Sequence, residues 1–168
     1  MEHDASIAPQ REPERCKILV VDDQPAKLLS YEVVLEGIGA TLLKASCACE
    51  AFEQLLKNDV ALILIDVYMP DIDGFELATL IREHPRFQRI GIIFVSAVMT
   101  ADPHKLRGYE LGAVDYVAVP VMPELLRAKV KVFLDLFQKT RELERLNAGL
   151  EQRILERAAQ LRSCNEEL

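Results

Sequence analysis

The sequence predicts an α/β fold in which one parallel sheet is covered by helices on both faces. Short apolar runs recur along the chain, as expected of strands that are buried on both sides. Segments with apolar residues at helical spacing alternate with these runs, and the connections between them are short. A length of 168 residues is enough for one such domain with an appendage.

Five strands are expected, and the third has the strongest signal because residues 61–65 are Ala-Leu-Ile-Leu-Ile. Four helices are expected between the strands, and a further helix begins near Met122 and Pro123, since proline is tolerated in a first helical turn. The expected strands are 17–21, 40–45, 61–65, 91–95 and 114–119. The expected connecting helices are 25–37, 47–58, 75–83 and 103–111.

Composition excludes several classes of protein. The net charge of −7 and the pI of about 5.1 argue against a general nucleic-acid binder, which needs a basic surface. No apolar run reaches the roughly 18–20 residues that are needed to cross a bilayer. Residues 1–15 contain Pro9, Pro13 and several charges, so we expect a disordered tail, no secretory signal and a cytoplasmic protein. The four cysteines are expected to be free thiols.

The candidate functional residues lie where the expected strands end. The first strand runs into Asp22 and Asp23, the third into Asp66 and the fourth into Ser96. Open parallel sheets bind ligands at the carboxyl ends of their strands, and the first and third strands are neighbours in a 2-1-3-4-5 order. Three carboxylates in one place repel one another, and a hard divalent cation such as Mg²⁺ relieves that repulsion. For Asp22 or Asp23 alone, the alternative is capping of the following helix.

Four motifs carry a resemblance to a known family. They are ILVVDD at 18–23, LIDVYMPDIDG at 64–74, FVSA at 94–97 and GAVDY at 112–116. In this order and spacing they resemble the receiver domain of two-component response regulators, over about residues 16–136. The resemblance implies a flavodoxin-like fold with strand order 2-1-3-4-5. It also implies a signalling module, not an enzyme, that takes a phosphoryl group from a histidine kinase or phosphotransfer protein.

The resemblance assigns the phosphoacceptor and the metal ligands. Asp66 is the acceptor and acts as a carboxylate nucleophile. Asp23 ligates Mg²⁺ directly and Asp22 does so through water. The backbone carbonyl of Tyr68, two residues after the acceptor, is a third ligand.

The resemblance also assigns residues that respond to phosphorylation, and it shows one departure. Ser96 hydrogen-bonds a phosphoryl oxygen, Tyr116 is the switch aromatic, and the side chains of Tyr68 and Val98 flank the site. The family has a lysine before the proline that follows the fifth strand, where this chain has Val119. Valine cannot neutralise a phosphoryl group as that lysine does. Two alternatives stay open: phosphorylation with altered switching, or a degenerate receiver that serves as a dimerisation or docking scaffold.

Other cations and other families fit the sequence less well. Lys105 and Arg107 are most simply part of a solvated helix face, although one of them reaching the phosphoryl group is an alternative. A phosphatase of the haloacid-dehalogenase kind is disfavoured, because that family has an Asp-x-Asp pair after its first strand. A flavodoxin is disfavoured because no Ser/Thr/Gly-rich phosphate loop follows the first strand.

The last expected helix runs from about residue 122 to the end of the chain. At 1.5 Å per residue it would be roughly 70 Å long, which is longer than a domain of this size needs. Apolar residues recur every seven positions in two runs, and the other faces are rich in Glu, Arg and Gln. The first run is Leu136, Leu143 and Leu150, with Leu146 at the other core position, and the second is Ile154, Leu161 and Leu168.

This pattern predicts that residues 137–168 form a parallel coiled-coil homodimer. The step from Leu150 to Ile154 is four residues, which breaks the phase beside Gly149. A single solvated helix is the alternative, although it would expose the leucine stripe to water. The segment resembles signalling linkers that join receivers to downstream domains, so we expect an output domain in a longer chain.

Overall fold

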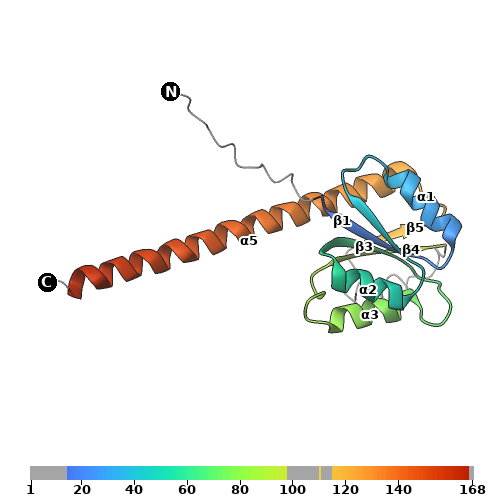
Figure 1. Ribbon diagram of the computed structural model, residues 1–168. Helices are drawn as coiled ribbons and strands as arrows, with labels where there is room; N and C mark the ends of the chain where they lie inside the picture. Colours follow the sequence, from blue (N-terminus) through green and yellow to red (C-terminus); the bar gives the residue numbers. More distant parts are fainter. Residues whose placement is uncertain (1–14, 98–109, 111–114, 167–168) are drawn as a thin grey trace, which may run out of the picture.

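The computed structural model describes residues 15–97, 110 and 115–166, and its sheet has five parallel strands in the order β2-β1-β3-β4-β5 (Figure 1). The predicted α/β class and strand order are therefore confirmed. The strands are β1 (Lys17–Val21), β2 (Thr41–Ala45), β3 (Val60–Asp66), β4 (Gly91–Ser96) and β5 (Asp115–Ala118).

The described helices also follow the prediction. They are α1 (Pro25–Leu35), α2 (Ala48–Lys57), α3 (Gly74–Glu83) and α5 (Pro123–Glu166). The helix expected at 103–111 lies outside the described residues except for Glu110, which is helical. Within the described residues, none of the helices combines the length and apolarity that a membrane span requires. The four cysteines are free thiols, as expected.

Each face of the sheet has its own apolar core, because alternate strand residues point to opposite sides. Helices α1 and α5 cover one face, and α2 and α3 cover the other (Figure 1). The α1/α5 core includes Val20, Leu64, Val95, Leu28, Tyr31, Leu126 and Val130. The α2/α3 core includes Val21, Ile65, Phe94, Leu55, Phe75, Leu77 and Ile81. Strand β3 is buried along its whole length, so it fixes the position of its last residue, Asp66.

Local sequence signals set the helix starts. Pro25 occupies the first turn of α1, where a missing backbone N–H costs nothing. Asp73 and Glu76 form a capping box at α3: each side chain accepts a hydrogen bond from the other residue's backbone N–H. At α2 the Cys47 Sγ atom accepts from the backbone N–H of Glu50, which gives this cysteine a capping role.

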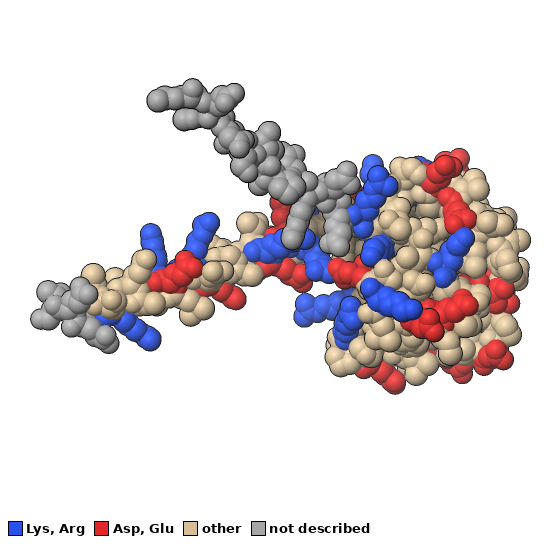
Figure 2. Space-filling view, viewed as in Figure 1, with Lys and Arg blue, Asp and Glu red and all other residues tan. Residues whose placement is uncertain are grey.

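Helix α5 packs on the domain through its N-terminal part, as far as Arg141, and then leaves it (Figure 1). Leu126, Val130 and Leu134 are buried, and Arg127 donates hydrogen bonds to the carbonyls at the end of α1. Further along, Arg141 forms an ion pair with Asp59. Figure 2 shows side chains of both charges along the projecting part. The long uninterrupted helix predicted from the sequence is confirmed over the described residues.

Candidate functional site

The carboxyl ends of β1 and β3 bring three aspartates together. Val21 pairs with Ile65 in the register of the two strands, so Asp22 and Asp66 follow side by side. Asp22, Asp23 and Asp66 each offer a carboxylate oxygen, and these atoms lie within 4.8 Å of one another. The cluster expected from the strand ends therefore exists.

Two carboxylate oxygens of this cluster are buried without a hydrogen-bond donor. Asp22 and Asp66 are 1% and 4% exposed. The Asp22 Oδ1 atom accepts from the backbone N–H of Gln24 at 2.9 Å. Asp22 Oδ2 and Asp23 Oδ1 have no hydrogen-bond partner among the described residues. Because buried polar atoms are normally paired and Mg²⁺ prefers carboxylate oxygen, these three side chains fit a divalent cation.

Charge crowding is visible in the pKa of Asp22. Burial raises this pKa above its usual value, and the charges of Asp66 and Asp23 raise it further. The backbone N–H of Gln24 and the ammonium of Lys27 act in the opposite direction without outweighing them. Without a metal, a negative charge on Asp22 is therefore costly in this cluster.

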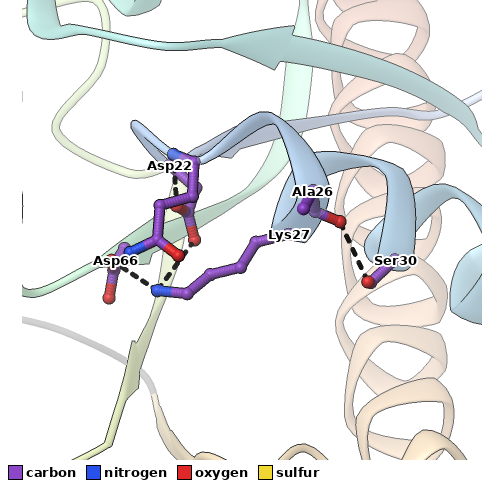
Figure 3. Close-up of polar contacts among 6 residues, drawn as sticks. Asp22, Ala26, Lys27, Ser30 and Asp66 are labelled. Atoms are coloured by element: carbon purple, nitrogen blue, oxygen red, sulfur yellow. Dashed lines mark hydrogen bonds and ion pairs between the residues drawn. The ribbon is translucent and has the colours of Figure 1, made fainter.

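Lys27 is a site residue that the sequence analysis missed. Its Nζ atom lies 3.1 Å from Asp66 Oδ2 and 3.6 Å from Asp22 Oδ2 (Figure 3). Burial lowers the pKa of Lys27, but the hydrogen bond to Asp66 and the charges of both aspartates offset this and raise it overall. The side chain is thus an ammonium that bridges two strand ends. The available signal was a lysine in the first turn of the helix that follows an acidic strand end.

The remaining predicted residues occupy three different environments. Ser96 ends β4 next to β3 and is 1% exposed, whereas the Tyr68 side chain is 52% exposed. Tyr116 pairs with Phe94 in the β4–β5 register, and its ring packs against the α2/α3 core. The ring centroids of these two residues are 6.3 Å apart. The structure thus places Ser96 beside the acidic cluster in the sheet order and Tyr116 on one face of the sheet.

Val119 contributes an apolar side chain after β5. This side chain packs against the α1/α5 core, and the backbone N–H donates to the Ser96 carbonyl at 2.8 Å. Three residues considered from the sequence, Val98, Lys105 and Arg107, lie outside the described residues.

The loop after Asp66 is held by a glycine at its far end. The Gly74 backbone N–H donates to the Val67 carbonyl at 2.9 Å, and a methyl group at Gly74 would lie 2.4 Å from the Asp66 carbonyl oxygen. Only a residue without a side chain allows this approach. Helix α3 is therefore seated directly against the backbone of the candidate phosphoacceptor.

Comparisons with known proteins match most of the chain. The family model described as "Response regulator receiver domain" matches residues 18–131. A Vibrio cholerae serotype O1 protein named "Probable cyclic di-GMP phosphodiesterase" is 32% identical over 149 residues, which are 88% of this chain and 33% of that protein. "Transcriptional regulatory protein YvrH" of Bacillus subtilis is 37% identical over 130 residues, which are 77% of this chain and 53% of that protein. The chain therefore spans about a third to about half of these curated relatives.

Solved structures show the same fold. A CheY-like receiver domain protein from Methanospirillum hungatei JF-1 has a TM-score of 0.67 and 29% identity, covering 76% of this chain and 99% of its own. The chemotaxis protein CheY4 of Vibrio cholerae has a TM-score of 0.67 and 25% identity, covering 71% of this chain and 99% of its own.

Proposed function

This chain belongs to the response regulator receiver family, and from that premise we propose that Asp66 accepts a phosphoryl group from a phosphohistidine. The donor is a histidine kinase or a phosphotransfer protein. The observation that carries the proposal is the position of Asp66: it ends the central strand β3 within 4.8 Å of two further carboxylates. A carboxylate held there is suited to act as a nucleophile on phosphorus.

The transfer itself needs little covalent chemistry from the protein. An Asp66 carboxylate oxygen attacks phosphorus, the phosphorus–nitrogen bond of the donor breaks, and the imidazole nitrogen takes the bonding pair. Asp22, Asp23, Asp66 and the backbone carbonyl of Tyr68 would hold Mg²⁺, with Asp22 acting through water. The bound ion supplies charge neutralisation for the phosphoryl oxygens. The two buried carboxylate oxygens without a hydrogen-bond donor among the described residues support this assignment.

We propose that Ser96 and Tyr116 respond to the phosphorylation of Asp66. Ser96 is buried at the end of β4, one strand from the acceptor, which suits a hydroxyl that hydrogen-bonds a phosphoryl oxygen. Tyr116 is partly buried on β5 and serves as the switch aromatic. Its ring packs on Phe94, so a change in its position would alter the α2/α3 core.

Phosphorylation is tested with acetyl phosphate and Mg²⁺ as reagents. Intact-protein mass spectrometry should show one added phosphoryl group on the wild-type chain and none on Asp66→Asn. Asp135→Asn, an exposed site on α5, is the matched control and should be modified like the wild type. A wild-type chain that gains no phosphate at any donor concentration would contradict the proposal.

Metal binding is tested separately by calorimetric titration with MgCl₂. We expect Asp23→Asn to weaken binding strongly because it removes a direct ligand with an unpartnered oxygen. Asp135→Asn again serves as the control. Equal affinity in wild-type protein and Asp23→Asn would refute the ligand assignment.

We further propose that α5 passes the signal on as a parallel homodimer, with residues 137–168 as the linker to a downstream output domain. The support is a stripe of apolar side chains that the single chain leaves in water. Its members are between 55% and 69% exposed, and they are Leu136, Leu143, Leu146, Leu150, Ile154 and Leu161. Each leucine removed from water contributes roughly 1.5–3 kcal/mol, so several pairs together offset the cost of association.

The dimer is tested by light scattering on the full chain. Wild-type protein should have the mass of a dimer at micromolar concentration, and the double variant Leu143→Ser with Leu150→Ser should shift toward monomer. Gln152→Ser lies on the same exposed helix and is the control. A monomeric wild-type chain would contradict this part of the proposal.

Orientation is tested with the exposed Cys164 near the end of α5. Mild oxidation should crosslink two chains in a parallel pair, and Cys164→Ser should abolish the crosslink. A dimer that resists crosslinking would argue for antiparallel helices, which would separate the two C-termini.

A second candidate function is a scaffold that is not phosphorylated. Val119 favours it, because that position offers an apolar side chain in place of the family's lysine. A scaffold would dimerise in the light-scattering experiment but would gain no mass with acetyl phosphate.

A further inference from the structure

The cluster of Asp22, Asp23 and Asp66 is paired with a cation that comes from helix α1 instead of from the end of β5. We propose that Lys27, on the first turn of α1, supplies the positive charge that stabilises the phosphoryl group during transfer to Asp66. In the metal-free protein the same ammonium neutralises part of the carboxylate cluster. The inference rests on the proposed function of Asp66 and adds a further catalytic residue to it.

The backbone places Lys27 over the pocket. Strand β1 ends at Val21, the side chain of the following Asp22 accepts from the Gln24 N–H, and α1 begins at Pro25. Lys27 is the third residue of that helix, and its side chain extends back across the strand ends (Figure 3). It thereby reaches the carboxylates that follow β1 and end β3 at once. With one third of the side chain exposed, the ammonium keeps room to follow a ligand.

Val119 makes a second positive charge from β5 unavailable. Its side chain has no donor and packs in the α1/α5 core, while its backbone N–H is used by the Ser96 carbonyl. Within the described part of the chain, Lys27 is the cation that forms ion pairs with Asp22 and Asp66. The positive charge needed at the phosphoryl group therefore has a source on α1, in place of the lysine that the family has after β5.

The formal charges of the cluster show what Lys27 would contribute before and after phosphorylation. Three carboxylates and one ammonium leave a formal charge of −2, which one divalent cation balances. Phosphorylation then replaces the single charge of Asp66 with a group that carries about two negative charges at neutral pH. Lys27 can donate to a phosphoryl oxygen after the ion has bound the carboxylates.

With acetyl phosphate as donor, an Asp66 oxygen bonds to phosphorus and the bond between phosphorus and the acyl oxygen breaks. Acetate leaves with the bonding electron pair, and Lys27 stays protonated throughout.

This arrangement predicts opposite effects on two ligands when Lys27 is removed. Mg²⁺ should bind more tightly, by about threefold to tenfold, because a competing charge a few ångströms away is gone. The phosphoryl group should be less well stabilised, so phosphorylation should slow by about tenfold or more. A purely structural role would weaken both.

The experiment compares Lys27→Met with wild-type protein, using three probes. MgCl₂ titration measures metal affinity, beryllofluoride with Mg²⁺ measures binding of a phosphoryl mimic, and acetyl phosphate measures the phosphorylation rate by intact mass. Lys44→Gln is the matched control, since this exposed lysine pairs with Glu32 away from the pocket. We expect tighter Mg²⁺, weaker beryllofluoride and slower phosphorylation for Lys27→Met only. Lys27→Arg, which keeps the charge, should stay closer to the wild type.

A rescue variant gives the most specific test of the role of Lys27. Adding Val119→Lys to Lys27→Met returns a cation to the end of β5, and phosphorylation should recover at least in part. Unchanged phosphorylation and beryllofluoride binding in Lys27→Met would overturn the catalytic role, whatever happens to Mg²⁺. A loss that Lys27→Arg shares and Val119→Lys does not rescue would also overturn it. If the wild-type chain itself takes neither phosphate nor beryllofluoride, the proposed function fails and this role fails with it.

Discussion

Replacing Gly74 with alanine should disturb the protein at Asp66, the proposed phosphoacceptor. The added methyl group would lie 2.4 Å from the Asp66 carbonyl oxygen, 2.9 Å from the Val67 Cα atom and 3.0 Å from the Ile65 Cγ2 atom. Non-bonded heavy atoms prefer separations of about 3.5 Å, so the backbone after Asp66 must move by about 1 Å. Two of the three atoms belong to the backbone, which cannot relax by changing a rotamer.

The magnitude follows from the cost of overpacking. An extra methylene group in a packed core typically costs about 1–3 kcal/mol, and rigid backbone neighbours place this site near the upper end. The smaller conformational freedom of alanine in the unfolded chain offsets less than about 1 kcal/mol. We therefore expect Gly74→Ala to lower the free energy of unfolding by about 2 kcal/mol. Mg²⁺ affinity should fall too, because the displaced strand end carries Asp66.

Urea denaturation followed by circular dichroism measures the first effect, and MgCl₂ titration measures the second. Gly149→Ala is the matched control: a methyl group there meets nothing within 4 Å. In an exposed helix this change should be favourable by about 0.5–1 kcal/mol. Equal urea midpoints and equal Mg²⁺ affinity for Gly74→Ala and wild type would refute the close-approach argument.

Three further predictions concern buried charges and the helix contacts. Asp22→Asn should stabilise the metal-free protein by about 1 kcal/mol at neutral pH, since burial and the neighbouring charges of Asp66 and Asp23 disfavour the charged carboxylate. Because the folded-state pKa of Asp22 is raised, that gain should shrink as the pH falls toward 4, which thermal melts in EDTA would reveal. Arg127→Met removes two hydrogen bonds of 2.7 Å to carbonyls at the end of α1 and should cost about 1–3 kcal/mol in urea. Arg82→Met frees the carbonyls of the loop before β4, and hydrogen exchange in that loop should become faster.

The sequence was sufficient for the sheet and for the three aspartates, because both depend on local patterns. A strand such as 60–66 is apolar at nearly every position, and the residue after a buried parallel strand always lies at the sheet's carboxyl edge. Lys27 could not be assigned in this way. Its role depends on where the first turn of α1 lies relative to β3, which is a tertiary relation between segments 39 residues apart. The close approach of Gly74 to the Asp66 carbonyl likewise cannot be predicted from the sequence, because it depends on how α3 packs.

If the proposed role of Lys27 holds, the cation at the acidic cluster comes from α1 instead of from the residue after β5, so α1 is the element in contact with the charge of a bound ligand. Tyr116 packs on the α2/α3 side of the sheet, whereas α5 packs on the other side together with α1. Helix α1 contacts the pocket at its first turn through Lys27 and is tied to α5 at its last turn through Arg127. Val119 belongs to the same apolar core as α1 and α5. The family has a lysine at this position, whereas here the side chain packs in the core that holds α5 on the sheet. A ligand that draws Lys27 away from Asp66 therefore acts on the one described helix that contacts both the acidic pocket and α5.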